Sequence, residues 1–329
     1  MLKLLSLIYA AGVARRNARF DSGRQPIVKI GKPVVSVGNI SAGGTGKTPV
    51  VQSIVRILQE QGKRPAIVMR GYRRTTKGLL VIHDGSKLCA GVNEAGDEAF
   101  FHAETLGIPV VVCEDKVEAA TYAVKKLPCD VIVVDDGFQH RALHRDCDIV
   151  LIDRATLNGQ LIPRGRLREP LTAMHRADVV LCVGDVSINE VSTFAQESAL
   201  VIHCPMRADT PRSIENDAEE LQSSARVIAV AGIAHPQRFV STLEDGGFDI
   251  VSERLFRDHH RYTSSDVSEL VAEARDTNAV IITTDKDIVK LRPHLFVNGA
   301  LQAPTFAVSI HAVLENTAFI ALLARRTSR

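Results

Sequence analysis

Short apolar runs alternate with amphipathic stretches along most of the chain. Residues 34–37, 65–69, 131–134 and 149–152 are rich in valine and isoleucine and almost continuously apolar, which is typical of strands buried on both faces. Stretches with apolar residues at helical spacing separate these runs, the clearest of them at residues 50–58. The alternation predicts an α/β fold: a doubly wound, mostly parallel sheet with helices on both faces.

The pattern is interrupted at about residues 208–224, where the composition becomes polar. It restarts with an apolar run at residues 227–231, followed by further helical and strand-like stretches. We therefore expect two domains: residues 1–207, and a second, smaller α/β domain at 225–329, joined by a linker at about 208–224.

A glycine-rich loop between the first strand and the helix behind it predicts a site for a nucleoside triphosphate. Glycines let main-chain N–H groups point inward at phosphates, the lysine reaches the terminal phosphates, and the threonine hydroxyl can hold magnesium. The usual pattern has a glycine five residues before Gly46, where this chain has Ser41. The loop residues expected at the nucleotide are Gly43, Gly44, Thr45, Gly46, Lys47 and Thr48.

Carboxylates follow two of the predicted strands and begin one predicted helix. Asp135 and Asp136 end the third apolar run, where an acid can complete the magnesium coordination that Thr48 begins. Asp153 ends the fourth run and is the rival metal ligand, although an acid there can also cap the next helix. Asp97 lies at a predicted helix start, where it is either a cap or a general base for a substrate hydroxyl.

Histidines form two further groups. Asp258-His259-His260 lies between a strand and a helix of the second domain, where an imidazole can act as a base or a phosphate partner, or be an ordinary solvated loop residue. His140 and His144 have i, i+4 spacing but no third ligand of the usual type nearby, so no zinc site is expected.

Composition and charge exclude several classes of protein. The 329 residues are 45% hydrophobic and 24% charged with a net charge of +2, which excludes a disordered chain and a polytopic membrane protein. The six cysteines are widely spaced with no CxxC pair, as buried thiols of a reducing compartment would be. The chain has no tryptophan and only four tyrosines, so no stacking platform for nucleic acid is expected.

The first residues form an apolar stretch followed by arginines. Residues 2–13 are too few to cross a bilayer, which takes about 20. A secretory signal would carry a triphosphate site to a compartment without ATP. Two readings remain: a helix lying in an anionic membrane surface with Arg15, Arg16 and Arg19 among the headgroups, or a helix packed on the protein's own core.

Taken together, the motifs resemble the tetraacyldisaccharide 4'-kinase family, the lipid A 4'-kinases of Gram-negative bacteria. The resemblance implies phosphorylation, dependent on ATP and Mg²⁺, of the 4'-hydroxyl of tetraacyldisaccharide 1-phosphate to give the 1,4'-bisphosphate. It also implies a peripheral enzyme on the cytoplasmic side of the inner membrane, held by the N-terminal helix, with no obligate protein partner and a second domain that closes over the nucleotide. The motifs that carry it are the glycine-rich loop, Arg70-Gly71-Tyr72, Gly96-Asp97-Glu98, Asp135-Asp136-Gly137-Phe138-Gln139-His140, Arg168-Glu169-Pro170, Ala231-Gly232-Ile233-Ala234, Asp258-His259-His260 and Thr283-Thr284-Asp285-Lys286-Asp287.

The resemblance also implies a role for individual residues. Asp97 acts as the base, paired with His259 or His260, and Gln139 lies near the metal and the phosphates. Lys116 stands where the family usually has an arginine, and lysine lacks the guanidinium's bidentate fork for phosphate. The remaining implied sites are Lys47 at the β- and γ-phosphates, Thr48 with Asp135 or Asp136 at Mg²⁺, and Tyr72, His140, Arg168 and Glu169 at the lipid headgroup.

Two other functions fit the glycine-rich loop. A nucleotide-switch or metallochaperone GTPase would need an Asn/Thr-Lys-x-Asp guanine motif, and Thr284-Asp285-Lys286-Asp287 has its lysine out of register. A kinase of the same fold acting on a soluble substrate would carry the N-terminal helix as ordinary core. Nucleotide preference and binding to anionic liposomes distinguish these functions from the lipid kinase.

Overall fold

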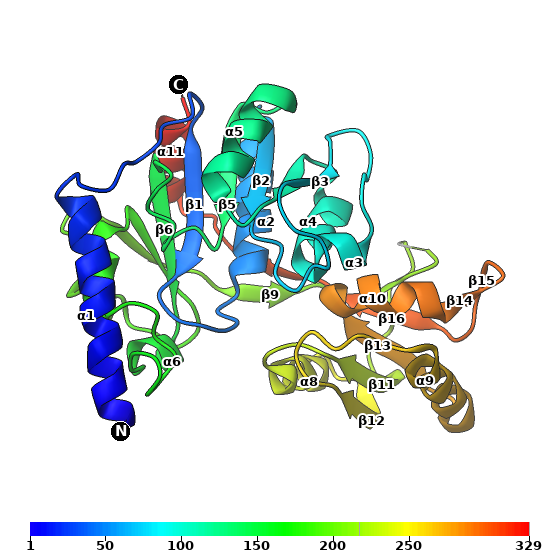
Figure 1. Cartoon of the computed structure of the whole chain (residues 1–329). Helices are drawn as coiled ribbons and strands as arrows, with labels where there is room; N and C mark the ends of the chain where they lie inside the picture. The colour runs from blue at the N-terminus through cyan, green and yellow to red at the C-terminus, as the bar shows by residue number, and fades with distance from the viewer. Residues whose placement is uncertain (217, 329) are drawn as a thin grey trace. The chain divides into compact units, whose positions relative to one another are not determined.

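The computed structural model of the chain describes residues 1–216 and 218–328 (Figure 1). It divides into two compact units. The larger comprises Met1–Met206 and Ala312–Arg329, and the smaller comprises Arg207–His311.

An eight-stranded sheet in the order β3-β4-β2-β5-β1-β6-β7-β8 forms the centre of the larger unit. Neighbouring strands are parallel except β3 and β4, which are antiparallel. β1 is central and β5 is its neighbour, so the glycine-rich loop and the paired aspartates lie at the same edge of the sheet. This confirms the predicted doubly wound, mostly parallel architecture. The strands are β1 (Val34–Asn39), β2 (Pro65–Met69), β3 (Leu80–His83), β4 (Val110–Val112), β5 (Val131–Asp135), β6 (Cys147–Ile152), β7 (Val179–Cys182) and β8 (Leu200–His203).

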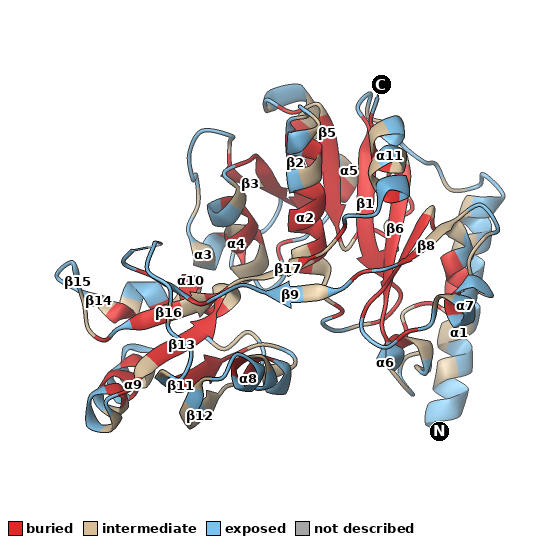
Figure 2. Ribbon diagram, turned by 180° about the vertical axis from the view of Figure 1, so that it is seen from behind, coloured by how far each residue is buried: buried red, intermediate tan, exposed pale blue. Residues whose placement is uncertain are grey.

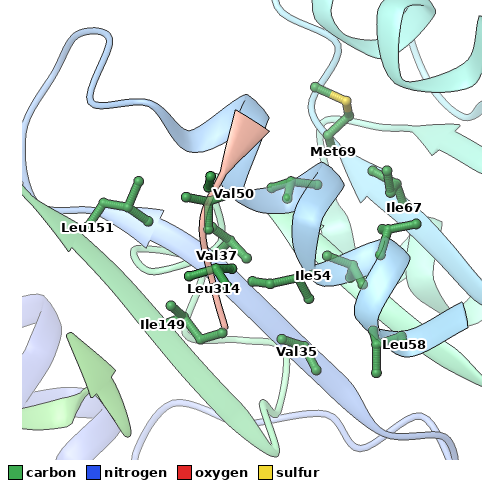
Figure 3. Close-up of a cluster of buried hydrophobic side chains, with 14 of the residues drawn as sticks. Val35, Val37, Val50, Ile54, Leu58, Ile67, Met69, Ile149, Leu151 and Leu314 are labelled. Carbon is green, nitrogen blue, oxygen red and sulfur yellow. The ribbon is translucent and has the colours of Figure 1, made fainter. Parts of the chain in front are cut away.

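Successive residues of each central strand face opposite layers of helices, because side chains alternate along a strand. Val35 and Val37 of β1 pack in a cluster with Ile54 of the helix after the loop, whereas Val34 packs on the other face (Figure 3). One face is covered by α2 (Lys47–Glu60), α4 (Asp97–Leu106) and α11 (Thr317–Arg326). The other is covered by α5 (Lys116–Lys126), η1 (Leu171–Arg176) and α7 (Ile188–Ser192), and α3 (Val92–Ala95) and α6 (Arg154–Leu157) are short connecting helices.

The end of the chain belongs to the larger unit, which differs from the predicted division at 225–329. Phe319 and Leu323 of α11 are fully buried in the same cluster as α2. Ser53 of α2 donates a hydrogen bond of 2.8 Å to the carbonyl of Ala312. The apolar face of α11 needs a partner, and α2 supplies one far away in sequence, which local composition cannot reveal.

The smaller unit is an α/β layer around a five-stranded sheet in the order β10-β16-β13-β11-β12. The polar stretch expected to be a linker contributes β10, which pairs antiparallel with β16, so this stretch is part of the unit. Helix α8 (Pro236–Asp245) packs on one face of the sheet, and α9 (Ser264–Thr277) and α10 (Asp285–Leu295) pack on the other. The strands are β10 (Arg212–Ser213), β11 (Arg226–Ala231), β12 (Asp249–Leu255), β13 (Val280–Thr284) and β16 (Thr305–Val308), and two further two-stranded sheets are formed by β14 (Phe296–Val297) with β15 (Ala300–Leu301) and by β9 (Met206–Ala208) with β17 (Ile310–Ala312).

The N-terminal stretch is a helix, α1 (Leu2–Asp21), and Val13 is its one buried residue among those described. Figure 2 shows most of its surface exposed, in contrast to the buried strands of the sheet. Its exposed apolar side chains include Leu4, Leu7 and Ile8. Among the described residues, no helix combines the length and the apolar character that crossing a membrane requires.

The Pro- and Arg-rich stretch at residues 161–170 forms no regular helix or strand, and only part of it is exposed. Leu167 is buried at 4% exposure and Glu169 has no exposed surface. The main chain of Ala42 donates a hydrogen bond of 2.7 Å to the carbonyl of Arg166. This stretch therefore supports the glycine-rich loop from beneath.

All six cysteines are free thiols, and all except Cys89 are buried. Burial raises the pKa of Cys182 to about 11 and that of Cys204 to about 12. A thiol that stays protonated at neutral pH is a poor nucleophile, so these two act as small apolar residues.

Candidate active site

The glycine-rich loop connects β1 to α2 and has the geometry of an anion-binding turn. Gly46 precedes the helix with φ of +85° and Gly43 has φ of +127°, conformations that other residues rarely adopt. Asn39 donates a hydrogen bond of 2.9 Å to the hydroxyl of Thr45, which holds the two ends of the loop together. Ser41, which replaces the usual glycine, is buried with its hydroxyl 3.0 Å from that of Thr156.

The two aspartates after β5 have different environments. Asp136 adopts a left-handed backbone conformation, with φ of +52°, that turns its side chain toward the loop. Its Oδ1 lies 3.7 Å from Nζ of Lys47, and its Oδ2 accepts a hydrogen bond of 2.8 Å from Arg168. Burial alone would raise the pKa of Asp136, but Lys47, Arg168 and Lys116 outweigh it and lower this pKa below its ordinary value.

Lys116 is buried below the same turn. Its ammonium group donates a hydrogen bond of 2.9 Å to the carbonyl of Asp135 and another to the carbonyl of Asp136. Burial lowers the pKa of Lys116, although the two neighbouring carboxylates oppose this effect. Because its ammonium group binds two carbonyls, Lys116 supports the main chain of this turn. This role differs from a phosphate contact by the arginine that is usual in the family.

The oxygen atoms at this edge fit a magnesium ion. Asp135 Oδ1 and Asp136 Oδ1 are buried and have no hydrogen-bond partner among the described residues. Thr48, which follows Lys47 at the end of the loop, is also buried, at 4% exposure. Carboxylate and hydroxyl oxygens are the hard ligands that Mg²⁺ prefers. No group of three or more His, Cys, Asp or Glu residues able to hold a metal occurs within residues 1–216 and 218–328. An ion here would therefore take other ligands from the nucleotide phosphates and water.

Asp153, His140 and Gln139 each contact other residues of the larger unit. Asp153 accepts a hydrogen bond of 2.8 Å from the main chain of Thr156, so it caps α6. His140 lies 3.7 Å from Asp115, and burial lowers the pKa of its imidazole. Gln139 donates a hydrogen bond of 2.9 Å to the carbonyl of Asn39, which places it beside the loop. Its place near the metal and the phosphates stays a prediction.

Asp97 is the first residue of α4 and is half-buried. Gly96 before it has φ of +83°, and a side chain there would lie 2.6 Å from the carbonyl of Tyr72. This close approach joins the Arg70-Gly71-Tyr72 and Gly96-Asp97-Glu98 motifs in space. Tyr72 itself is 59% exposed, with the guanidinium of Arg73 5.5 Å from its ring.

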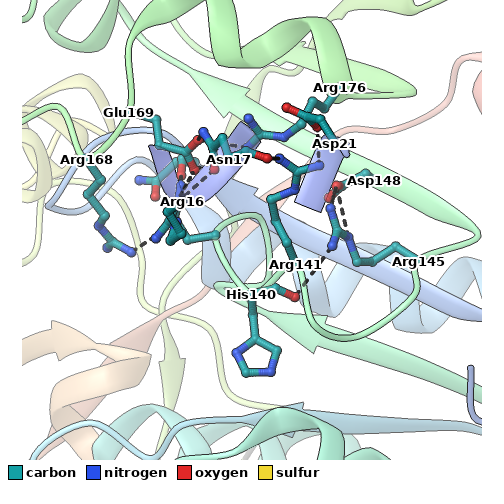
Figure 4. Close-up of polar contacts among 12 residues, drawn as sticks. Arg16, Asn17, Asp21, His140, Arg141, Arg145, Asp148, Arg168, Glu169 and Arg176 are labelled. Atoms are coloured by element: carbon teal, nitrogen blue, oxygen red, sulfur yellow. Dashed lines mark hydrogen bonds and ion pairs between the residues drawn. The ribbon is translucent and has the colours of Figure 1, made fainter. Parts of the chain in front are cut away.

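Arg168 and Glu169 have separate roles (Figure 4). Arg168 is directed to Asp136 and to Gln139, at 2.8 and 3.3 Å. Glu169 is fully buried and accepts hydrogen bonds from Asn17 of α1 and from Arg176, at 2.8 and 3.0 Å. The fully buried carboxylate thus joins α1 to η1, which differs from the headgroup contact that the resemblance implies.

His259 and His260 of the smaller unit contact different neighbouring side chains. His260 stacks on Phe256 with ring centroids 4.4 Å apart and lies 3.1 Å from Asp266, so its ring is engaged within the unit. His259 has a left-handed backbone with φ of +59°, and its Nε2 lies 3.9 Å from Asp258. Both imidazoles thus have partners within the smaller unit. Asp97 and His259 belong to different units, and their pairing stays a prediction.

Three polar residues near these groups belong to none of the sequence motifs. Asn17 and Arg176 bind Glu169, and His102 of α4 lies 3.5 Å from Asp135. The one available signal was a polar residue within an apolar helical stretch, as His102 is at residues 99–103.

A family model described as tetraacyldisaccharide-1-P 4'-kinase matches residues 1–328. The chain belongs to this family. Among the curated tetraacyldisaccharide 4'-kinases, that of Anaeromyxobacter sp. (strain Fw109-5) is 37% identical over 305 residues, covering 89% of this chain and 82% of the relative. That of Syntrophus aciditrophicus (strain SB) is 38% identical over 318 residues, covering 89% and 84%.

A solved structure of the same family has a similar fold. The crystal structure of the "apo" form of LpxK from Aquifex aeolicus in complex with ATP has a TM-score of 0.78 and 31% sequence identity. The match covers 98% of this chain and 97% of that chain. Membership of the kinase family along the whole chain does not favour the GTPase alternative.

Proposed function

We infer that this protein is a phosphotransferase that transfers the γ-phosphoryl group of ATP to the 4'-hydroxyl of tetraacyldisaccharide 1-phosphate, giving the 1,4'-bisphosphate in lipid A biosynthesis. The observation that carries this inference is the family match over residues 1–328, with a phosphate loop whose Lys47 faces Asp136. The related structure holds ATP, which supports ATP as the phosphate donor here.

The phosphate site supplies positioning and charge neutralisation, which are the main contributions that phosphoryl transfer needs. Lys47 would neutralise the β- and γ-phosphates, while main-chain N–H groups from Gly43 to Gly46 cradle them. Thr48 with Asp135 or Asp136 would hold Mg²⁺, which neutralises charge on the transferred group when it is bound. Arg168, fixed by Asp136 at 2.8 Å, adds a further positive charge at this edge.

Asp97 is the proposed general base for the acceptor hydroxyl. It begins α4, and Gly96 before it packs against the main chain of Tyr72, so its position is set by backbone contacts. A base must lie within hydrogen-bond reach of the hydroxyl that it deprotonates. His259 or His260 would orient this carboxylate.

The lipid headgroup would be bound by Tyr72, His140 and Arg168. Tyr72 offers an exposed aromatic face for the sugar, and the other two offer donors for its polar groups. Glu169 would not contact the headgroup itself. It would position α1 through its contacts with Asn17 and Arg16.

The membrane contact would be α1, on the cytoplasmic face of the inner membrane. Leu4, Leu7 and Ile8 are each more than 60% exposed, at 64%, 61% and 61%. Arginines at positions 15 and 19 extend the same helix and would favour anionic headgroups. An exposed apolar helix end favours the membrane-surface reading over ordinary core.

The test is transfer of label from radioactive ATP to purified tetraacyldisaccharide 1-phosphate. The wild type is expected to form labelled bisphosphate, and Asp97→Asn is expected to lose nearly all turnover while still binding ATP. Glu104→Gln, an exposed acid of the same helix, serves as the matched control and should retain wild-type turnover. Normal turnover in Asp97→Asn would reject the base, and ATP hydrolysis without labelled lipid would reject the acceptor.

A further inference from the structure

His102 of α4 is a buried polar side chain without a hydrogen bond. It has no exposed surface, and neither ring nitrogen has a hydrogen-bond partner among the described residues. Leaving a buried polar group unpaired destabilises the folded protein. An imidazole in this position therefore requires a physical reason.

The surroundings of His102 favour an apolar residue. Ala99 and Ala103, on either side of it along the helix, belong to the apolar cluster that joins α4 to the central sheet. A leucine would suit such surroundings without an unpaired nitrogen. Asp135 is a polar group close to it, with Oδ2 3.5 Å from Nε2 of His102.

Lys116 contacts the main chain of Asp135. Its ammonium group donates a hydrogen bond of 2.9 Å to the carbonyl of Asp135, and this bond does not involve the carboxylate. Oδ1 of Asp135 is buried and has no hydrogen-bond partner among the described residues. A closure of a few tenths of an ångström would bring His102 to an ordinary N–H···O distance from Oδ2.

We propose that His102 is a positioning residue: its Nε2–H donates to Oδ2 of Asp135 and turns Oδ1 toward the ion that Thr48 and the nucleotide phosphates hold. This rests on the proposed function, in which Asp135 binds the metal. Ligating carboxylates are commonly oriented by such outer hydrogen bonds, and losing one typically weakens metal binding about 10- to 100-fold.

The experiment measures binding of Mn²⁺, by its electron paramagnetic resonance signal, to the full chain with a non-hydrolysable ATP analogue. His102→Leu is expected to bind Mn²⁺ about 10- to 100-fold more weakly. It is expected to unfold at the same temperature as the wild type or above it, because the substitution removes an unpaired imidazole from apolar surroundings. Binding of the analogue without metal should be unchanged.

Two variants test the specificity of this effect. His102→Gln keeps an N–H donor and should recover much of the lost Mn²⁺ affinity. His83→Leu removes another buried histidine, whose Nδ1 accepts a hydrogen bond of 3.0 Å from Gly85, and should leave Mn²⁺ binding unchanged.

The outcomes separate this inference from the proposed function. Wild-type Mn²⁺ affinity in His102→Leu, or equal losses in His102→Leu and His102→Gln, would overturn the role of His102. If His102→Leu does not fold, the inference is also wrong, because His102 is then needed for the stability of the fold and not for positioning Asp135. If the wild type itself binds no Mn²⁺ with the analogue, the metal assignment of the proposed function fails instead.

Discussion

The side-chain amide of Asn17 donates a hydrogen bond of 2.8 Å to the carboxylate of Glu169, 152 positions further along the chain. The residue before Glu169 is Arg168, which binds Asp136 at the phosphate site. Two successive residues thus connect the N-terminal helix to the aspartates after β5. The helix that would meet the membrane and the loop that would hold the nucleotide share one short segment.

Glu169→Gln should destabilise the larger unit. Glu169 is fully buried, with Arg176 at 3.0 Å and Arg16 at 3.4 Å. The substitution leaves the half-buried guanidinium of Arg176 without its carboxylate, and such a loss costs about 1–3 kcal/mol. Urea unfolding followed by circular dichroism should show the loss. Glu190→Gln, which removes an exposed partner of Arg154, should leave the midpoint almost unchanged, and equal effects in the two variants would contradict the prediction.

Lys116→Met should weaken the turn after β5 while preserving the volume of the side chain. It leaves the carbonyls of Asp135 and Asp136 without their buried donor, at a cost of about 1–3 kcal/mol. We expect a lower free energy of unfolding and a lower turnover number. Lys125→Met changes an exposed lysine of the same helix and controls for the loss of a charge. If both variants behave as wild type, Lys116 does not support this turn.

The stability contributed by Asp136 should depend on pH. Its pKa in the folded state lies below the ordinary value of 3.8. As the pH falls through that value the unfolded chain takes up a proton first, so the contribution is present above it and is lost as the pH falls through the folded pKa. The difference in unfolding free energy between wild type and Asp136→Asn, measured without divalent metal, should shrink as the pH falls from about 5 to about 2. A constant difference over this range would refute the favourable field of Lys47 and Arg168.

Replacing Leu4, Leu7 and Ile8 by serine should abolish flotation with anionic liposomes. These side chains are exposed, so their loss removes apolar area from a membrane contact without opening a cavity in the core. Transfer of phosphate to substrate dispersed in detergent should persist, because the phosphate site is unchanged. Val297→Ser, at an exposed apolar residue of the smaller unit, should float as the wild type does. Retained flotation of the triple variant would show that α1 is not the membrane contact.

Much of the fold could be predicted from local patterns. The apolar runs predicted the central strands of the larger sheet and β11 of the smaller one, because residues buried on both faces must be apolar whatever their neighbours are. They did not predict β10, which lies in the polar stretch expected to be a linker. The turn chemistry of Gly46 and the apolar run before Asp135 likewise placed the phosphate loop and the acids at the carboxyl ends of strands. The order of motifs was specific enough to indicate the family before any contact was known.

Contacts between distant segments were decided only by the tertiary structure. The sequence by itself determined the strands, the phosphate loop and the family, since these depend on local periodicity and short spacings. It could not show that α11 packs on α2, that Glu169 is buried under Asn17, or that His102 faces Asp135. These contacts depend on which surfaces pack together when the chain folds. The sequence around a polar residue is the same whether water or a buried charge will contact its side chain.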